Sequence, residues 1–130
     1  MKLHFYHCKV CGKVIAVLSD SGAPTICCGR VMEELVVNRS EGSGEKHLPV
    51  CRVGGNVVRV MVGSEDHPMK DEHRIMWIGL QTAQGFQFRE LAPEDHPEAL
   101  FFVNVGDRPE TVYAYCNIHG LWNTEIREPS

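Results

Sequence analysis

The sequence lacks the long apolar stretches that place proteins in or across membranes. No segment of its 130 residues approaches the length of a membrane span, and no apolar run precedes the first cysteine, Cys8. We therefore expect no signal peptide and a reducing, cytoplasmic location. In that compartment the six cysteines indicate metal ligands more readily than disulfides, which remain the alternative.

An excess of charge of one sign is also missing. Thirteen basic and seventeen acidic residues are interspersed along the chain and give a net charge of −4. A general nucleic-acid binder needs a basic face for phosphates, so this balance argues against that class. A small anionic substrate stays compatible with it, because the local field at a site matters more than the total charge.

Segments with a helical period are absent, and short apolar runs rich in β-branched residues take their place. Gly54-Gly55-Asn56 separates two such runs and predicts a β-hairpin over residues 47–62. Four prolines fall between the runs, where no ladder donor is needed: Pro68, Pro93, Pro97 and Pro109. The other expected strands are 74–80, 86–91, 100–105, 111–115 and 121–126. The pattern predicts a small all-β sandwich of about seven strands.

A polar segment with two glycines, residues 38–44, is typical of a surface linker. We expect it to separate a first unit, residues 1–37, from a second unit, residues 38–130. In the first unit, residues 13–18 predict a strand that ends in the turn 19–22. A unit this small cannot build an adequate core alone, so a bound metal has to supply much of its stability.

Four cysteines in the first unit form a candidate metal site. Cys8 and Cys11 belong to a Cys-x-x-Cys-Gly knuckle, and Cys27 and Cys28 follow as an adjacent pair before a glycine. Four thiolates suit tetrahedral zinc or a single iron, and ligand counting alone does not decide between them. Because Cys27 and Cys28 are adjacent, we expect the tetrahedron to be splayed on one side.

A second candidate site combines histidines with one cysteine in the second unit. Each of these residues stands beside a predicted strand end or turn, and a Cys-x-x-His pair can reach one metal from a tight turn. The candidates are His47, His67, His73, Cys116 and His119. The backbone amides of Ile118 and His119 are candidates to hydrogen-bond the sulfur of Cys116. His4, His7 and His96 receive no metal role, and Cys51 is expected to be a buried strand residue.

The order of these motifs resembles that of the desulfoferrodoxin family. Cys-x-x-Cys-Gly, Cys-Cys-Gly, Glu-Lys-His, His-Pro-Met, a further histidine and Cys-Asn-x-His-Gly-Leu-Trp follow one another from Phe5 to Trp122. The resemblance implies a mostly β chain: a small desulforedoxin- or rubredoxin-like metal-knuckle domain, then an immunoglobulin-like β-sandwich that carries the catalytic site.

The same resemblance implies two mononuclear iron ions. The first ion would be bound by Cys8, Cys11, Cys27 and Cys28. The second would have four equatorial imidazoles, those of His47, His67, His73 and His119, with Cys116 axial and the sixth position open in the ferrous state. Glu45 would occupy that position when iron is ferric, and Lys46 would attract the anionic substrate.

The implied activity is that of a superoxide reductase, which reduces superoxide to hydrogen peroxide by one electron. The resemblance also implies detoxification in anaerobic or microaerophilic cells, a homodimer, and rubredoxin or a similar small protein as electron donor. Two alternatives follow from the residues. One is a non-catalytic, rubredoxin-like electron-transfer module, and the other is a zinc-binding protein, although five protein ligands do not match hydrolytic zinc.

Overall fold

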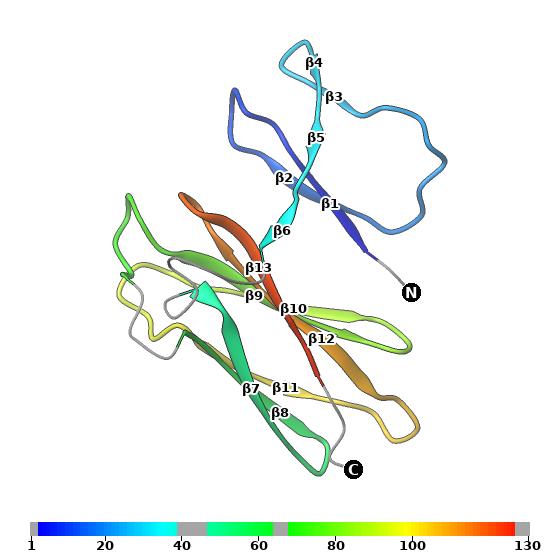
Figure 1. The fold of residues 1–130 in the computed structure, drawn as a ribbon, viewed down its shortest axis with the longest axis vertical. Coiled ribbons are helices and arrows are strands. Elements are labelled where there is room, and N and C mark those ends of the chain that lie inside the picture. The colour runs from blue at the N-terminus through cyan, green and yellow to red at the C-terminus, as the bar shows by residue number, and fades with distance from the viewer. Residues whose placement is uncertain (1–2, 39–46, 64–67, 127–130) are drawn as a thin grey trace. The chain divides into compact units, whose positions relative to one another are not determined.

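The structure is a computed structural model, and it describes residues 3–38, 47–63 and 68–126. Contacts within the chain divide it between Val36 and Val37 into two compact units (Figure 1). The boundary expected from the sequence lies one residue later. None of the described residues forms a helix long and apolar enough to cross a membrane.

The first unit consists of short strands connected by tight turns. Strand β1 (His4–His7) lies between β2 (Val14–Val17) and β5 (Glu33–Glu34) in a three-stranded sheet, and β3 (Ile26–Cys27) pairs with β4 (Arg30–Val31). The strand expected at 13–18 is therefore confirmed as β2. The expected turn after it is also present, because the side chain of Asp20 accepts a hydrogen bond from the N–H of Gly22 at 2.8 Å.

The second unit is a sandwich of two sheets (Figure 1). The larger sheet has the order β10-β9-β12-β13-β6, and the smaller has the order β11-β8-β7. The strands are β6 (Val37–Asn38), β7 (Pro49–Gly54), β8 (Val57–Val62), β9 (Ile75–Thr82), β10 (Phe86–Glu90), β11 (Glu98–Phe102), β12 (Pro109–Cys116) and β13 (Gly120–Glu125). The mostly β fold predicted from the sequence is confirmed. The predicted hairpin is β7–β8, in which Gly54 pairs with Val57 around Gly55-Asn56.

Apolar side chains from both sheets fill the space between them. Buried residues alternate with less buried ones along β8 and β11, as a sheet with one buried face requires, whereas β9 is buried along nearly its whole length. The most deeply buried members are Val58, Val60, Ile75, Ile78, Leu80, Val112, Ala114 and Cys116, each 0% exposed. Burial of one such aliphatic side chain stabilises the fold by about 1.5–3 kcal/mol. Since Cys116 belongs to this cluster, the core fixes the position of a candidate ligand.

Three details differ from the sequence-based expectations. Strand β11 spans Glu98–Phe102 rather than 100–105, because its pairing with β8 begins directly after Pro97. Pro109, expected between strands, is the first residue of β12, a position where no N–H is needed. Asn38, expected in the linker, pairs in parallel with Trp122 as part of β6.

Candidate metal centres

The four cysteines of the first unit lie together, and we call them the four-thiol set. Their sulfur atoms are all within 4.8 Å of one another. The sulfurs of Cys11 and Cys27 are 3.6 Å apart, and those of Cys27 and Cys28 are 4.0 Å apart. In a tetrahedral site with metal–sulfur bonds of about 2.3 Å, neighbouring sulfurs are about 3.8 Å apart. The set therefore fits one tetrahedral ion, and the expected splaying beside the adjacent pair stays a prediction.

The knuckle that carries Cys8 and Cys11 is a tight turn at the end of β1. The N–H of Gly12 donates to the carbonyl of Cys8 at 2.9 Å, and the N–H of Cys8 donates to the carbonyl of Lys13 at 2.9 Å. Gly12 has a φ of +83°, which a residue with a side chain rarely adopts. The turn brings Cys11 back towards Cys8, which is itself buried.

The adjacent cysteines sit on a two-residue hairpin loop. Cys27 pairs with Arg30 across β3–β4, so Cys28 and Gly29 form the loop between them. Both have positive φ, +53° and +72°, as a type I′ turn requires. Asparagine usually occupies the first of these positions. Here a cysteine takes the left-handed conformation, which allows both thiols to reach one ion.

The thiols of this set differ in pKa. Backbone N–H groups of Cys11 and Val10 donate to the sulfur of Cys8 and lower its pKa to about 6. The pKa of Cys28 is raised to about 12, first because of its side-chain hydrogen bond with Cys11 and then because of that with Cys8. The pKa of Cys27 is also raised, for the same two causes. A bound cation would reverse this balance, because it favours the thiolates.

The second donor set lies at one end of the sandwich. Ligand atoms of His47, His73, Cys116 and His119 are all within 4.8 Å of one another. His47 Nε2 is 2.9 Å from His119 Nδ1, which in turn is 3.7 Å from Cys116 Sγ. Two nitrogen ligands at right angles, about 2.1 Å from a metal, are about 3.0 Å apart. These donors, which we call the histidine set, fit neighbouring positions around a single ion.

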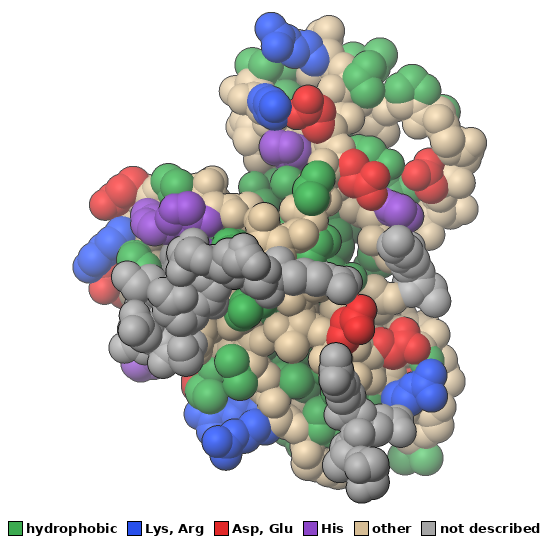
Figure 2. All heavy atoms as spheres, viewed as in Figure 1, with side chains coloured by type: hydrophobic (Ala, Val, Ile, Leu, Met, Phe, Trp, Pro, Cys, Tyr) green, Lys and Arg blue, Asp and Glu red, His purple; other side chains and the backbone are tan. Residues whose placement is uncertain are grey.

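Strand ends and the connections between strands supply the four members of this set. His47 lies two residues before β7, and His73 precedes β9 after a turn in which Lys70 and His73 exchange backbone hydrogen bonds of 2.9 and 3.2 Å. Cys116 ends β12 next to an irregularity in its pairing with β9. Bulges of this kind often redirect side chains beside active sites. His119 lies in the β12–β13 turn before Gly120, and histidines reach the surface at this end (Figure 2).

Burial and hydrogen bonding act in opposite directions on Cys116. Loss of hydration raises its pKa, while the backbone amides of His119 and Ile118 lower it. The N–H of His119 donates to Cys116 Sγ at 3.4 Å. The prediction of such a hydrogen bond to the sulfur is confirmed for His119. Such donors stabilise the thiolate that a metal requires.

Two further residues that hold the site received no role from the sequence. Trp122 stacks on the ring of His47, with centroids 4.9 Å apart, and its Nε1–H donates to the carbonyl of His119 at 3.2 Å. Asn117 hydrogen-bonds both residues that flank His73. Both belong to the Cys-Asn-x-His-Gly-Leu-Trp motif, so the motif marks them, but only the fold shows what they contact.

Three predicted site residues, Glu45, Lys46 and His67, lie outside the described residues. Their roles therefore stay predictions. Cys51 is half-buried on β7, and burial raises the pKa of its thiol. The expectation of a strand residue is thus confirmed, although its burial is partial.

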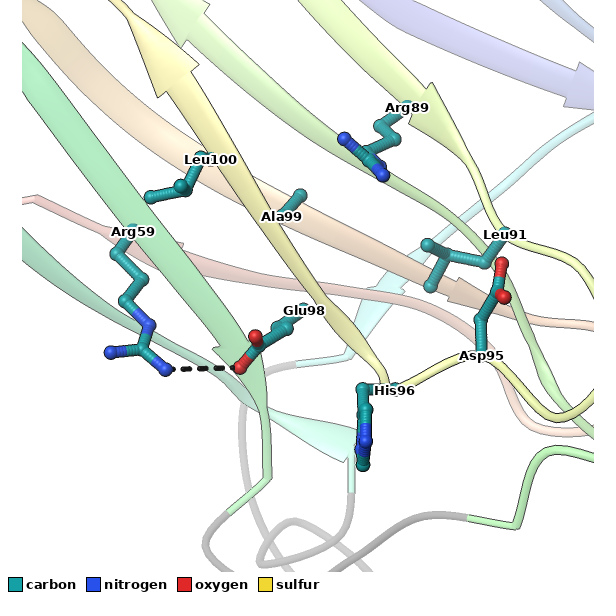
Figure 3. Close-up of a pocket in the computed structure, with 8 residues that line it drawn as sticks. All are labelled: Arg59, Arg89, Leu91, Asp95, His96, Glu98, Ala99 and Leu100. Atoms are coloured by element: carbon teal, nitrogen blue, oxygen red, sulfur yellow. Dashed lines mark hydrogen bonds and ion pairs between the residues drawn. The ribbon is translucent and has the colours of Figure 1, made fainter.

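A cavity of about 490 Å³ lies between the edges of β10 and β11 (Figure 3). None of its lining residues belongs to either donor set. Arg59 at its rim pairs with Glu98 at 3.2 Å, and Asp95 accepts a hydrogen bond from the N–H of Ala92 at 2.8 Å. Arg59, Glu98 and Asp95 thus have partners within the fold. The candidate functional residues therefore remain those of the two donor sets.

Comparison with known proteins agrees with both donor sets. The family model described as "Desulfoferrodoxin" matches residues 39–125, and the one described as "Desulfoferrodoxin, N-terminal domain" matches residues 1–35. A desulfoferrodoxin of Syntrophotalea carbinolica is 42% identical over 125 residues, which cover 95% of this chain and 97% of that protein.

Two proteins named superoxide reductase are also similar. The crystal structure of the superoxide reductase from Treponema pallidum matches with a TM-score of 0.82 and 33% identity, covering 95% of this chain and 98% of that one. The superoxide reductase of Pyrococcus horikoshii is 38% identical over 109 residues, covering 70% of this chain and 94% of that protein. The fold, the two donor sets and these matches show that the chain belongs to the desulfoferrodoxin family.

Proposed function

We propose that this chain is a superoxide reductase, which adds one electron and two protons to superoxide and gives hydrogen peroxide. The observation that carries the proposal is the histidine set, three imidazoles and one thiol gathered at one end of the sandwich. Imidazole and thiolate ligands together suit redox-active iron. The names of the relatives from Treponema pallidum and Pyrococcus horikoshii support the same reaction.

The cofactors are two iron ions, one for each donor set. We assign the first ion to Cys8, Cys11, Cys27 and Cys28. We assign the second to His47, His67, His73, Cys116 and His119, of which His67 rests on the His-Pro-Met motif alone. The imidazoles of His47, His73 and His119 and the thiol of Cys116 are close enough together to bind one ion. This convergence supports the proposed five-ligand site that also includes His67.

Iron held by the histidine set would supply the one-electron chemistry of the reaction. The chain's own residues prepare the site for it. Cys116 is fully buried, so water does not reach its sulfur, and the N–H of His119 stabilises the thiolate. Since imidazoles are neutral ligands, the Cys116 thiolate alone would offset the charge of a bound cation, and the remaining positive charge would attract superoxide. His119 is exposed, which leaves this side of the set accessible from solvent.

Lys46 and Glu45 are our proposed catalytic residues beside the ion. Lys46 is expected to steer superoxide by its charge, and Glu45 to bind at the open position in the ferric state. The Lys46→Ala variant should show a lower second-order rate with superoxide and a weaker dependence on salt, because steering is screened by ions. Lys13→Ala, a change in the first unit, is the matched control. Equal rates for Lys46→Ala and wild type at low salt would refute the steering role.

We further propose that residues 1–37 are a desulforedoxin-like domain and residues 38–130 the catalytic domain. The iron of the first domain would relay electrons or stabilise its fold. Rubredoxin or a similar small protein is our proposed donor, and a homodimer our proposed assembly. A reducing cytoplasm suits a chain whose cysteines are all free, and removal of superoxide there would protect the cell.

A rubredoxin-like electron carrier or a zinc protein is the alternative function. An electron carrier or a structural zinc ribbon would use the four-thiol set alone and leaves the convergence of His47, His73, Cys116 and His119 without a role. Hydrolytic zinc usually has three protein ligands and a water, fewer ligands than this convergence offers.

The test combines metal analysis with pulsed superoxide. Anaerobically purified and reduced protein should contain about two irons per chain and consume superoxide with formation of peroxide and without release of oxygen. His119→Ala should abolish this reaction. Cys28→Ser should retain it in the pre-reduced protein, because it alters only the four-thiol set. Zinc in the four-thiol set and no iron in the histidine set would overturn the proposal.

A further inference from the structure

Asn117 lies next to the histidine set along the chain and contacts it from two sides. It follows Cys116 directly and precedes His119 by two positions, on the turn between β12 and β13. Its side-chain Oδ1 accepts a hydrogen bond from the N–H of Arg74 at 3.0 Å, and its Nδ2 donates to the carbonyl of Glu72 at 3.1 Å. Its backbone N–H donates to the carbonyl of Arg74 at 3.3 Å.

The two partners of Asn117 are the chain neighbours of His73. The Asn117 side chain therefore contacts the backbone on both sides of the candidate ligand His73. The backbone of Asn117 is bonded directly to a second candidate ligand, Cys116. The side chain needs an acceptor and a donor in one plane, which an amide provides. A carboxylate of the same shape supplies the acceptor and lacks the donor. An alanine supplies neither.

The position of Asn117 also continues an interrupted ladder. The register between β12 and β9 shifts between Tyr115 and Cys116, where Cys116 pairs with Ile75. Beyond this irregularity the next contact is that of Asn117 with Arg74. The Asn117 side chain thus strengthens pairing where the strands end and the ligand-bearing connections begin.

We propose that Asn117 is a positioning residue, which sets the separation between the His73 imidazole and the Cys116 thiolate and assembles the donor set before an ion enters. The inference rests on the proposed function for the identity of the ion as iron, whereas the positioning applies to any divalent ion bound there. Residues that orient ligands typically change metal affinity by about 10–100-fold when they are removed.

The experiment measures Co²⁺ binding to the metal-free protein, with no superoxide present. The absorption bands of Co²⁺ distinguish a site with four thiolates from one with a single thiolate. The variants are Asn117→Ala and Asn117→Asp. Asp107→Ala is the matched control, because Asp107 accepts backbone hydrogen bonds from Gln84 and Arg108, and Gln84 lies beyond the end of β9 opposite His73. Thermal unfolding of each variant measures the accompanying loss of stability.

In Asn117→Ala we expect Co²⁺ affinity at the histidine set to fall by about 10–100-fold and the thiolate-to-cobalt band of Cys116 to shift. Affinity at the four-thiol set of the same molecule should not change. Asn117→Asp should lie between Asn117→Ala and wild type, because it keeps one of the two side-chain bonds. Asp107→Ala should bind Co²⁺ like wild type at both sets.

Two results would overturn the positioning role. One is wild-type affinity and an unshifted band in Asn117→Ala. The other is an equal loss of affinity in Asp107→Ala at an equal loss of thermal stability. A failure of the proposed function is a different result from these two. In that case the wild-type protein would not reduce superoxide, but Co²⁺ affinity would still differ between Asn117→Ala and Asp107→Ala.

Discussion

Trp122 contacts two candidate ligands with different parts of its side chain. Its ring face stacks on the imidazole of His47, and its Nε1–H donates a hydrogen bond to the backbone carbonyl of His119. Trp122→Phe keeps an aromatic ring and loses the donor, so we expect a loss of about 1 kcal/mol in the free energy of unfolding. Trp122→Leu loses both and should cost about 3 kcal/mol. Urea unfolding of the metal-free protein measures both values. Equal losses in the two variants would show that the hydrogen bond matters more than the ring.

The thiol pKa values of the four-thiol set predict how its metal affinity depends on pH. The raised pKa values of Cys27 and Cys28 keep both thiols protonated at neutral pH, whereas Cys8, with a pKa of about 6, is already a thiolate. A metal binds thiolates, so it must displace at least the protons of Cys27 and Cys28. We expect the logarithm of the Cd²⁺ affinity to rise by about two or more per pH unit between about pH 6.5 and 8.

Competition with a chelator at several pH values measures this slope, and Cys28→Ser should reduce it. An affinity that is independent of pH would contradict the protonation states assigned to these thiols.

At the scale of single residues, the sequence identified the candidate ligands better than the residues that support them. Spacing and neighbouring turns were sufficient for Cys8, Cys11 and the Cys116–His119 pair, because ligands on one tight turn are close in sequence as well as in space. Asn117 and Trp122 act on His73 and His47, which lie far from them along the chain. Such contacts depend on the pairing of β9, β12 and β13, which local patterns do not specify.

At the scale of elements, the β3–β4 hairpin depends on one glycine. Gly29 has a φ of +72°, and an added Cβ there would meet no atom within 4 Å. Gly29→Ala should therefore act through backbone conformation alone and cost about 1–2 kcal/mol. We expect weaker metal binding at the four-thiol set as well, because Cys27 and Cys28 depend on this turn. Thermal unfolding and Cd²⁺ affinity are the measurements.

Gly85→Ala is the matched control for Gly29→Ala. It lies in the β9–β10 turn, has space for a Cβ and has no positive φ in the left-handed range. A loss of stability as large as that of Gly29→Ala would indicate a cause other than the left-handed backbone.

The sequence predicted the strands of the sandwich more accurately than the ends of those strands. Apolar runs located β8 and β9, because β8 buries one face and β9 is buried along nearly its whole length. The start of β11 and the place of Pro109 in β12 were not predicted correctly. A strand begins where a neighbouring strand offers hydrogen-bond partners, and those partners are distant in the sequence. The irregularity beside Cys116 has no local signal either, although it helps to aim a ligand.

At the scale of the whole molecule, the two units differ in what stabilises them. The second unit has a continuous apolar core, whereas the first unit ends at Val36 and contains the four-thiol set. A unit of this size depends on its metal for much of its stability. Removal of the first ion should therefore increase amide hydrogen exchange in β1–β5 and leave β8, β9 and β12 protected.

The double variant Cys8→Ser, Cys28→Ser, analysed by hydrogen exchange and mass spectrometry, tests this separation. Faster exchange throughout the sandwich strands would contradict it. The control is Cys51→Ser, which alters a cysteine outside both donor sets and should leave exchange in the first unit unchanged.

The parallel pairing of β6 with β13 has a consequence for the gene. Val37 and Asn38 belong to the second unit by their contacts, and Asn38 donates to the carbonyls of His119 and Leu121 at 3.4 and 3.2 Å. A deletion that removes the first unit spares the second only if the new start codon precedes these two residues. The codons for Val36 and Val37 therefore mark the place where fusion or loss of the four-thiol module would be tolerated during evolution.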